Sequence, residues 1–269
     1  MSLQFIIGSS GSGKSCYAYQ NIIEQAGLHP EKLFFVIVPE QFTMQTQKNV
    51  VEMHPGKGIL NIDVLSFQRL AYRVFEEVGG AREVLLDDTG KSLLLQKLVQ
   101  QHKKELPYLG SQMNKPGYLD EVKSLISEFM QYDIRQEELS DMLEKTGEDS
   151  LLQMKMNDVS VLYQAFTDYL EGHYMTGEGV MDALKKAIPF SRKLKNSVLL
   201  LDGFTGFTPV QMNVIRELLA VCDQVLVTVT MDVKENPLQM GKPHQLFYMS
   251  RKMIHTLSGL TNDLDDPVY

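Results

Sequence analysis

Near its amino terminus the chain reads Gly8-Ser9-Ser10-Gly11-Ser12-Gly13-Lys14-Ser15. This run follows a short apolar segment, Leu3 to Ile7, and opens an amphipathic segment from Lys14 to Ala26, which Gly27 is expected to close. Glycines allow the tight backbone turns that such a connection needs. The pattern predicts a strand, a loop and a helix in the G-x-x-x-x-G-K-S arrangement of a phosphate-binding loop.

Further along the chain, apolar runs and helical patterns alternate. Leu33 to Val38 is rich in Phe, Val and Ile and predicts a buried parallel strand, followed by a helix from Gln41 to Val51. Ile59 to Leu65 alternates as a third strand, and Ser66 is a natural N-cap for a helix from Phe67 to Val78. This order of elements predicts an α/β fold with a parallel sheet.

The pattern changes between residues 86 and 189. Apolar residues there recur at three- and four-residue intervals, as in Val122, Leu125 and Phe129, which predicts an all-helical insertion. Strand patterns return at Ser197 to Leu201 and at Gln224 to Met231, separated by a helix from Val210 to Val221. We therefore predict an α/β core of residues 1–85 and 190–269, interrupted by a helical insertion of residues 86–189.

The glycine-rich loop predicts a site for ATP and Mg²⁺. Successive backbone N–H groups face phosphate oxygens, Lys14 reaches the β and γ phosphates, and Ser15 offers its hydroxyl to the metal. The predicted nucleotide-binding residues are Gly8, Gly11, Ser12, Gly13, Lys14 and Ser15. The alternative is a vestigial loop that keeps its shape without binding nucleotide.

A phosphate-loop protein also needs an acidic residue at the end of another core strand, where it holds the water shell of the magnesium ion. Asp202 follows the apolar run Val198 to Leu201, so we predict Ser15 and Asp202 as the metal-site residues. Gly203 stands where an active helicase-type ATPase would carry a Glu that orients the attacking water, which puts ATP turnover in doubt. Alternatively, Asp202 simply begins a turn.

Polar and aromatic side chains follow the second and third strands, in residues 39–43 and 66–73. Ligands bind at this edge of open α/β sheets, and rings beside amides and cations suit single-stranded nucleic acid. From the residues alone, however, we favour a plainer reading, in which Phe67 belongs to the core and Arg69 to a solvated face. Phe204 and Phe207 fit neither a strand nor a helix period, and are equally compatible with stacking platforms and with a domain interface.

Composition restricts the class of protein further. The net charge of −8 argues against a surface that attracts nucleic acid everywhere, but it is compatible with a local basic groove. Cys16 and Cys222 are too few for a disulfide framework or a metal cluster, and no stretch approaches the ~20 apolar residues of a membrane span. We expect a cytoplasmic protein.

Asn262 to Tyr269 reads as the interior of a loop, so we also expect a longer protein of which this is the first part.

Four blocks of sequence, taken in order, resemble the amino-terminal part of the B subunit of AddAB-type ATP-dependent helicase-nucleases. They are Gly8 to Ser15, Val38 to Thr43, Val64 to Arg73 and Leu201 to Phe204. The order and spacing agree over essentially the whole segment. The helical insertion falls where superfamily 1 helicases place a 1B subdomain inside a RecA-like 1A core.

The resemblance implies a subunit that processes DNA double-strand breaks for recombinational repair, with a degenerate motor and an A subunit as its partner. It also implies a site that holds the 3′ strand and recognises a short sequence. By that match the DNA-contact candidates are Gln41, Thr43, Phe67, Arg69 and Tyr72, and more weakly Phe204 and Phe207. The iron-sulfur cluster of the family belongs to a carboxy-terminal exonuclease domain, which we do not expect in this segment.

Two other functions compete with this interpretation. A free-standing phosphate-loop kinase would be compact, with a substrate lid, and would not carry a helical insertion of this size. A scaffold with a vestigial loop would not bind ATP. Titration with ATP and Mg²⁺ separates the scaffold from the nucleotide-binding subunit.

Overall fold

The structure, a computed structural model, describes residues 2–79, 83–113, 115, 117–145 and 151–262. The chain divides into two compact units, one of residues 1–80 and 183–269 and the other of residues 81–182. The parallel sheet of the first unit confirms the predicted α/β class. The unit boundaries lie a few residues before the predicted domain boundaries, and the division into a core and an insertion stays a prediction.

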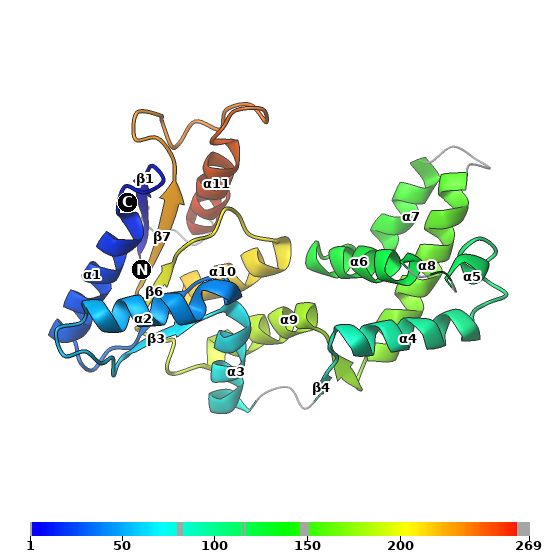
Figure 1. Cartoon of the computed structure of the whole chain (residues 1–269), viewed down its shortest axis with the longest axis horizontal. Helices are drawn as coiled ribbons and strands as arrows, with labels where there is room; N and C mark the ends of the chain where they lie inside the picture. The colour runs from blue at the N-terminus through cyan, green and yellow to red at the C-terminus, as the bar shows by residue number, and fades with distance from the viewer. Residues whose placement is uncertain (1, 80–82, 114, 116, 146–150, 263–269) are drawn as a thin grey trace. The chain divides into compact units, whose positions relative to one another are not determined.

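The first unit is built on a five-stranded sheet in the order β1-β7-β6-β2-β3 (Figure 1). The strands are β1 Ser2–Gly8, β2 Phe34–Ile37, β3 Ile62–Leu65, β6 Val198–Leu201 and β7 Gln224–Thr230. Neighbouring strands all run parallel. Every residue of β2 and β6 is buried, which explains why both strands are continuous apolar runs in the sequence.

Helices cover both faces of this sheet. They are α1 Lys14–Leu28, α2 Thr43–Met53, α3 Phe67–Val78, α10 Pro209–Val221 and α11 Tyr248–Asn262, with 3-10 helices η1 Glu40–Phe42 and η2 Ile188–Phe190. Ile22 of α1 and Val50 of α2 share one apolar cluster with Val36 of β2. Phe35 and Ile37 point to the opposite face of the sheet and are equally buried.

The ends of α1 and α3 show how local sequence sets the helix bounds. Ser66 caps α3 by accepting a hydrogen bond from the backbone N–H of Arg69, and α3 has the predicted bounds. Gly27, by contrast, does not close α1, which continues to Leu28. The Asn61 side-chain amide donates to the carbonyl of Ala26 at 3.1 Å. A residue far along the chain therefore supplies a hydrogen bond to a carbonyl group at the end of α1.

The sequence analysis missed α11, although its buried residues have a helical period. Met253, Ile254, Leu257 and Leu260 recur at intervals of one, three and three residues, and all are buried. The predicted loop at residues 262–269 falls almost entirely outside the described residues; Asn262 itself ends α11. No helix in the described ranges is both long and apolar enough to cross a membrane.

The second unit is mostly helical. Its helices are α4 Asp88–Gln101, α5 Leu109–Gln112, α6 Tyr118–Gln131, α7 Gln136–Lys145 and α8 Leu151–Leu170, and α9 Gly177–Ala187 begins in it. The prediction that residues 86–189 are all helical was wrong at one point. Strand β5 Tyr174–Met175 pairs in parallel with β4 Val84–Leu85, and runs of two residues are too short to give a strand pattern.

A buried ion pair ties two helices of the second unit together. The Lys91 ammonium lies 3.0 Å from a carboxylate oxygen of Glu178, and both side chains are about nine-tenths buried. The Ser127 hydroxyl accepts a further hydrogen bond from Lys91 at 3.2 Å. Burial opposes ionisation of Glu178, but the Lys91 charge and hydrogen bonds outweigh it and lower the pKa of that carboxyl. This pair links α4 to the start of α9.

Candidate nucleotide and nucleic-acid site

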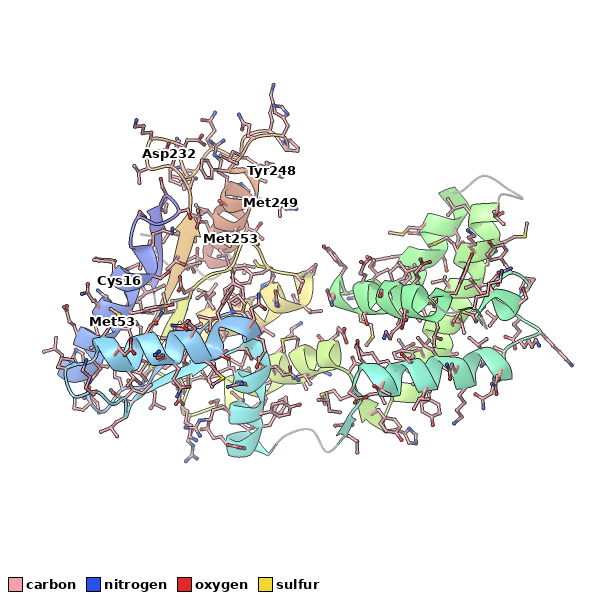
Figure 2. All side chains as sticks on the ribbon, in the orientation of Figure 1. Cys16, Met53, Asp232, Tyr248, Met249 and Met253 are labelled. Carbon is pink, nitrogen blue, oxygen red and sulfur yellow. The ribbon has the colours of Figure 1, made fainter. Side chains whose placement is uncertain are left out.

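The predicted site residues all follow carboxyl ends of strands in the first unit. Because the sheet is parallel, these ends lie along one edge of it. The glycine-rich loop follows β1, and Asp202 follows β6. The loop that contains Asp232 leaves the end of β7 (Figure 2). The backbone N–H of Met231 donates to the carbonyl of Gly8 at 3.0 Å, which fixes the end of β7 beside the start of the loop.

The loop between β1 and α1 depends on glycine for two separate reasons. Gly11 and Gly13 have φ angles of 73° and 87°, which residues with a Cβ rarely adopt. Space favours glycine at position 8 instead, because a Cβ atom there would lie 2.5 Å from the hydroxyl oxygen of Ser12 and 3.0 Å from Cγ of Lys14, so these side chains would have to move. Both conditions agree with the positions of glycine in the phosphate-loop pattern.

The amino-terminal end of α1 carries no side-chain cap. Gly13 is the N-cap residue, and no side chain hydrogen-bonds the first N–H groups of the helix. Such groups are natural donors to an anion, and the helix dipole adds partial positive charge. The Lys14 ammonium folds back over the loop and donates to the carbonyl of Ser9 at 2.9 Å. The loop therefore has the Lys14 ammonium folded onto it and uncapped backbone N–H groups at the start of α1.

Asp202 is the centre of a buried cluster of hydroxyl groups. Its side chain accepts a hydrogen bond from Ser15 at 2.9 Å and shorter ones from Tyr19 and Thr228. Asp202, Tyr19 and Thr228 are all buried. The cluster joins the first two turns of α1 to β6 and β7, so the predicted pair of Ser15 and Asp202 is in direct contact.

The sequence analysis missed Tyr19 and Thr228, although each leaves a signal. Tyr19 lies four residues after Ser15, which places both side chains on one face of α1. Thr228 is a polar residue inside the buried part of β7. Burial raises the pKa of the Tyr19 hydroxyl, and the Asp202 charge and hydrogen bond raise it further, so Tyr19 remains a proton donor.

The block after β2 is divided between a buried and an exposed residue. Thr43 is buried, and its hydroxyl donates to the carbonyl of Glu40 at 2.9 Å, so it caps the turn into α2. Gln41 is exposed. Phe42, which the sequence analysis did not select, is 48% exposed beside it. Gln41 and Phe42, with Glu40, are thus the exposed side chains of this block.

Three of the aromatic candidates, Phe67, Phe204 and Phe207, form one cluster. Phe67 is buried, and its ring centroid lies 5.6 Å from that of Phe204 and 6.3 Å from that of Phe207. Phe204 and Phe207 lie 5.0 Å apart and are partly exposed. The packing of Phe67 agrees with the interpretation that it belongs to the core. The rings of Phe204 and Phe207 cover it from the solvent side.

Arg69 and Tyr72 lie on the exposed side of α3. The Arg69 guanidinium forms an ion pair with Glu40 at 3.1 Å, and both side chains are about half exposed. Tyr72 is 42% exposed, and its ring packs edge-on against Phe75 and not against the aromatic cluster around Phe67. The structure thus brings α3 and the block after β2 together through the Arg69–Glu40 pair, with Tyr72 apart from both.

Comparison with known proteins identifies the family. The family described as "ADDB, N-terminal" matches residues 5–267. The chain belongs to the AddB N-terminal family. This confirms the resemblance drawn from the four sequence blocks.

The relatives of this AddB segment are much longer proteins, each named as the B subunit of an ATP-dependent helicase/deoxyribonuclease. The protein of Lachnoclostridium phytofermentans is 45% identical over 97% of the chain, which covers 23% of that relative. The protein of Clostridium acetobutylicum is 36% identical over 86% of the chain and 20% of its own length. That of Alkaliphilus metalliredigens is 33% identical over 94% of the chain and 22% of its own length. The chain thus spans about a fifth of the length of these relatives.

The donor set of this AddB segment fits a magnesium-bound triphosphate. Within the described ranges, no three His, Cys, Asp or Glu side chains are grouped so that they could hold a metal ion by themselves. Ser15 and Asp202 provide oxygen atoms beside the loop, and hard oxygen donors suit Mg²⁺, which usually keeps several waters and binds phosphate as well. These oxygen donors therefore fit a metal ion that is bound together with a nucleotide.

Proposed function

We propose that this AddB segment binds ATP with Mg²⁺ on the loop between β1 and α1. The observation that carries the proposal is the uncapped start of α1 after two glycines of positive φ, with Lys14 beside it. The free N–H groups bind phosphate oxygens, and the Lys14 ammonium moves from the Ser9 carbonyl to the β and γ phosphates. Ser15 binds the metal while Asp202 accepts its hydroxyl proton.

The motor of the proposed RecA-like core is degenerate. Gly203 follows Asp202, so this position has no carboxylate to orient an attacking water. Gly203 also has a φ of 79°, which disfavours any residue with a side chain there. The segment therefore holds nucleotide and positions its phosphates without driving hydrolysis.

The carboxyl edge of the sheet is proposed to hold the 3′ strand of DNA. Gln41, Phe42 and Tyr72 are exposed polar or aromatic groups, and Arg69 supplies a half-exposed guanidinium that is paired with Glu40. In the complete subunit, paired with an A subunit, this surface serves the processing of DNA double-strand breaks. The family and the names of the relatives support that assignment.

Calorimetric titration with ATP, with and without Mg²⁺, combined with a steady-state ATPase assay, tests this function. We expect ATP to bind and turnover to stay well below the ~1 to 100 s⁻¹ that is typical of kinases. A chain that binds no ATP at any Mg²⁺ concentration is a scaffold with a vestigial loop. Turnover within that range, lost in Asp202→Ala, would show that the motor is active.

A further inference from the structure

We propose that the second unit binds a partner protein by taking an arginine side chain of that partner into a pocket beside strand β5. The pocket encloses about 280 Å³, is open to solvent, and is lined by residues of the second unit alone. Pockets for small-molecule ligands usually enclose ~300–1,000 Å³, so this one suits a single side chain better. The inference goes beyond the proposed function and does not depend on nucleotide binding in the first unit.

The walls of the pocket match a long cationic side chain. Met130, Leu170 and Met175 supply apolar surface. Glu83 and Glu171 supply carboxylates from exposed positions, and neither carboxylate has a hydrogen-bond or ion-pair partner in the part of the chain that the structure describes. An arginine lays its aliphatic stem on apolar surface, and its planar guanidinium binds carboxylates through two parallel hydrogen bonds.

Tyr174 adds an aromatic ring to the pocket. Its ring is stacked with that of Tyr169, with centroids 6.1 Å apart and 8° between the planes. A cation already lies on this stack, because the Lys97 ammonium is 4.5 Å from the centroid of the Tyr169 ring and donates to the Tyr169 hydroxyl at 3.0 Å. Guanidinium groups are attracted to aromatic faces in the same way. Tyr174 therefore offers a second cation contact on the side of the pocket.

Exposed apolar residues extend the surface beside the pocket. Val84 is 64% exposed and Leu85 41%, and both directly follow Glu83 in the chain. They form β4, which pairs with the Tyr174–Met175 strand, and both residues of that strand line the pocket. Aromatic residues, Met and Arg are enriched in the cores of protein interfaces. The surroundings of the pocket thus resemble such an interface.

The charge of the second unit favours a basic protein segment over DNA. Residues 81–182 contain 19 Asp and Glu and 10 Lys and Arg, whereas the rest of the chain contains 15 and 16. The net charge of −8 therefore arises in the second unit, which repels phosphates and attracts cations. Among the described residues, no group of three His, Cys, Asp or Glu side chains could hold a metal ion, so a metal is a poorer fit than a guanidinium.

Glu171→Gln removes one carboxylate of the pocket and keeps the size of the side chain. We expect it to weaken arginine binding about three- to tenfold, which is less than the loss for a fully buried charged pair because Glu171 is exposed. Tyr174→Leu should also weaken binding, through loss of the ring. Glu137→Gln is the matched control, since it makes the same change of charge at an exposed position of α7 that does not line the pocket.

NMR spectra of the chain with ¹³C-labelled methionine methyl groups test the pocket directly. Met130 and Met175 line it, and Met44 is an exposed methionine of the first unit. The probe is the tripeptide Gly-Arg-Gly with both ends blocked, titrated without ATP. The matched probe carries citrulline in place of arginine, which keeps the shape and removes the charge. We expect the arginine peptide to shift the signals of Met130 and Met175 saturably and to leave Met44 unchanged, and the citrulline peptide to shift none of them.

Three outcomes overturn the inference. The first is an equal response to the citrulline peptide, and the second is an equal loss of affinity in Glu171→Gln and Glu137→Gln, because either result means that the pocket does not recognise the arginine charge. The third is a larger response of Met130 and Met175 to a single-stranded oligonucleotide, which would assign the surface to DNA. Thermal unfolding of each variant verifies the fold, and Glu83→Gln replaces Glu171→Gln if that variant is unfolded. None of these results bears on ATP binding, so failure here is distinct from failure of the proposed function.

Discussion

The glycine-rich loop after β1 and the surface of α3 lie on the same edge of one sheet, but they are stabilised in opposite ways. Around the loop, the polar groups are buried and bonded to each other, as Asp202 is to Tyr19 and Thr228. On α3, the polar groups are half exposed, and Arg69 has a carboxylate partner in Glu40. The polar groups of the first region find their hydrogen-bond partners within the chain. The second offers groups that a partner can still recruit.

This contrast indicates where substitutions should act. A group inside a buried network is needed for folding and for binding at once, because its loss leaves other buried groups without partners. A group on a half-exposed surface contributes little to the fold, since solvent already competes for it. We expect such a group to contribute to the free energy of binding only when the partner is bound. Substitutions in each of the two regions therefore test this difference.

Phe67→Ala should destabilise the chain by about 3–5 kcal/mol, because it removes a buried ring packed against Phe204 and Phe207. Chemical denaturation of the chain measures this. Tyr72→Ala, on the exposed side of the same helix, should change stability by no more than about 0.5 kcal/mol. Equal losses in the two variants would remove the distinction between the packed and the open aromatic residues.

Lys14→Ala should weaken ATP binding by about 1.5–3 kcal/mol, the range for a hydrogen bond to a charged group. Calorimetric titration at saturating Mg²⁺ gives the difference. Lys48→Ala is the matched control, since Lys48 is an exposed lysine on α2. Indistinguishable titration curves for Lys14→Ala and Lys48→Ala would reject the loop as the nucleotide site.

Tyr72→Ala should weaken the binding of single-stranded DNA by the assembled enzyme by ~1 to 3 kcal/mol, through loss of one stacking contact. Tyr132→Ala provides the control, because Tyr132 is 58% exposed and lies in the second unit. Fluorescence anisotropy with a labelled oligonucleotide measures both. A larger loss in Tyr132→Ala would place the contact in the second unit and not at the edge of the sheet.

Arg69 and Glu40 should give the smallest effects on stability and a characteristic salt response. Glu40→Gln removes an exposed ion pair worth about 0.2–1 kcal/mol and frees Arg69, so DNA binding of the assembled enzyme should strengthen. Arg69→Ala should reduce the salt slope of binding by about 1 if the guanidinium contacts phosphate. An unchanged slope, with loss of sequence preference, would indicate a contact with a base. No change in affinity, slope or preference in either variant would assign the pair to surface packing.

The sequence predicted much of the fold because the deciding signals are local. Ser66 and the period of the following apolar residues set the bounds of α3, and continuous apolar runs marked β2 and β6. Local sequence patterns predicted less where contacts between residues far apart in the chain decide the structure. Asn61 caps α1, so Gly27 was not needed to end the helix, and β5 exists only because β4 pairs with it.

The candidate site shows the same division. The glycine positions, Lys14, Ser15 and an acidic residue after an apolar strand are properties of short segments, and the sequence alone predicts a site from them. The family, which the sequence also indicated, is confirmed. Tertiary structure decided which groups meet. Tyr19 and Thr228 reach Asp202 across separations of 183 and 26 residues, and Phe204 covers Phe67. These contacts depend on the order of the strands and on which side chains become buried, and neither follows from the spacing of residues along the chain.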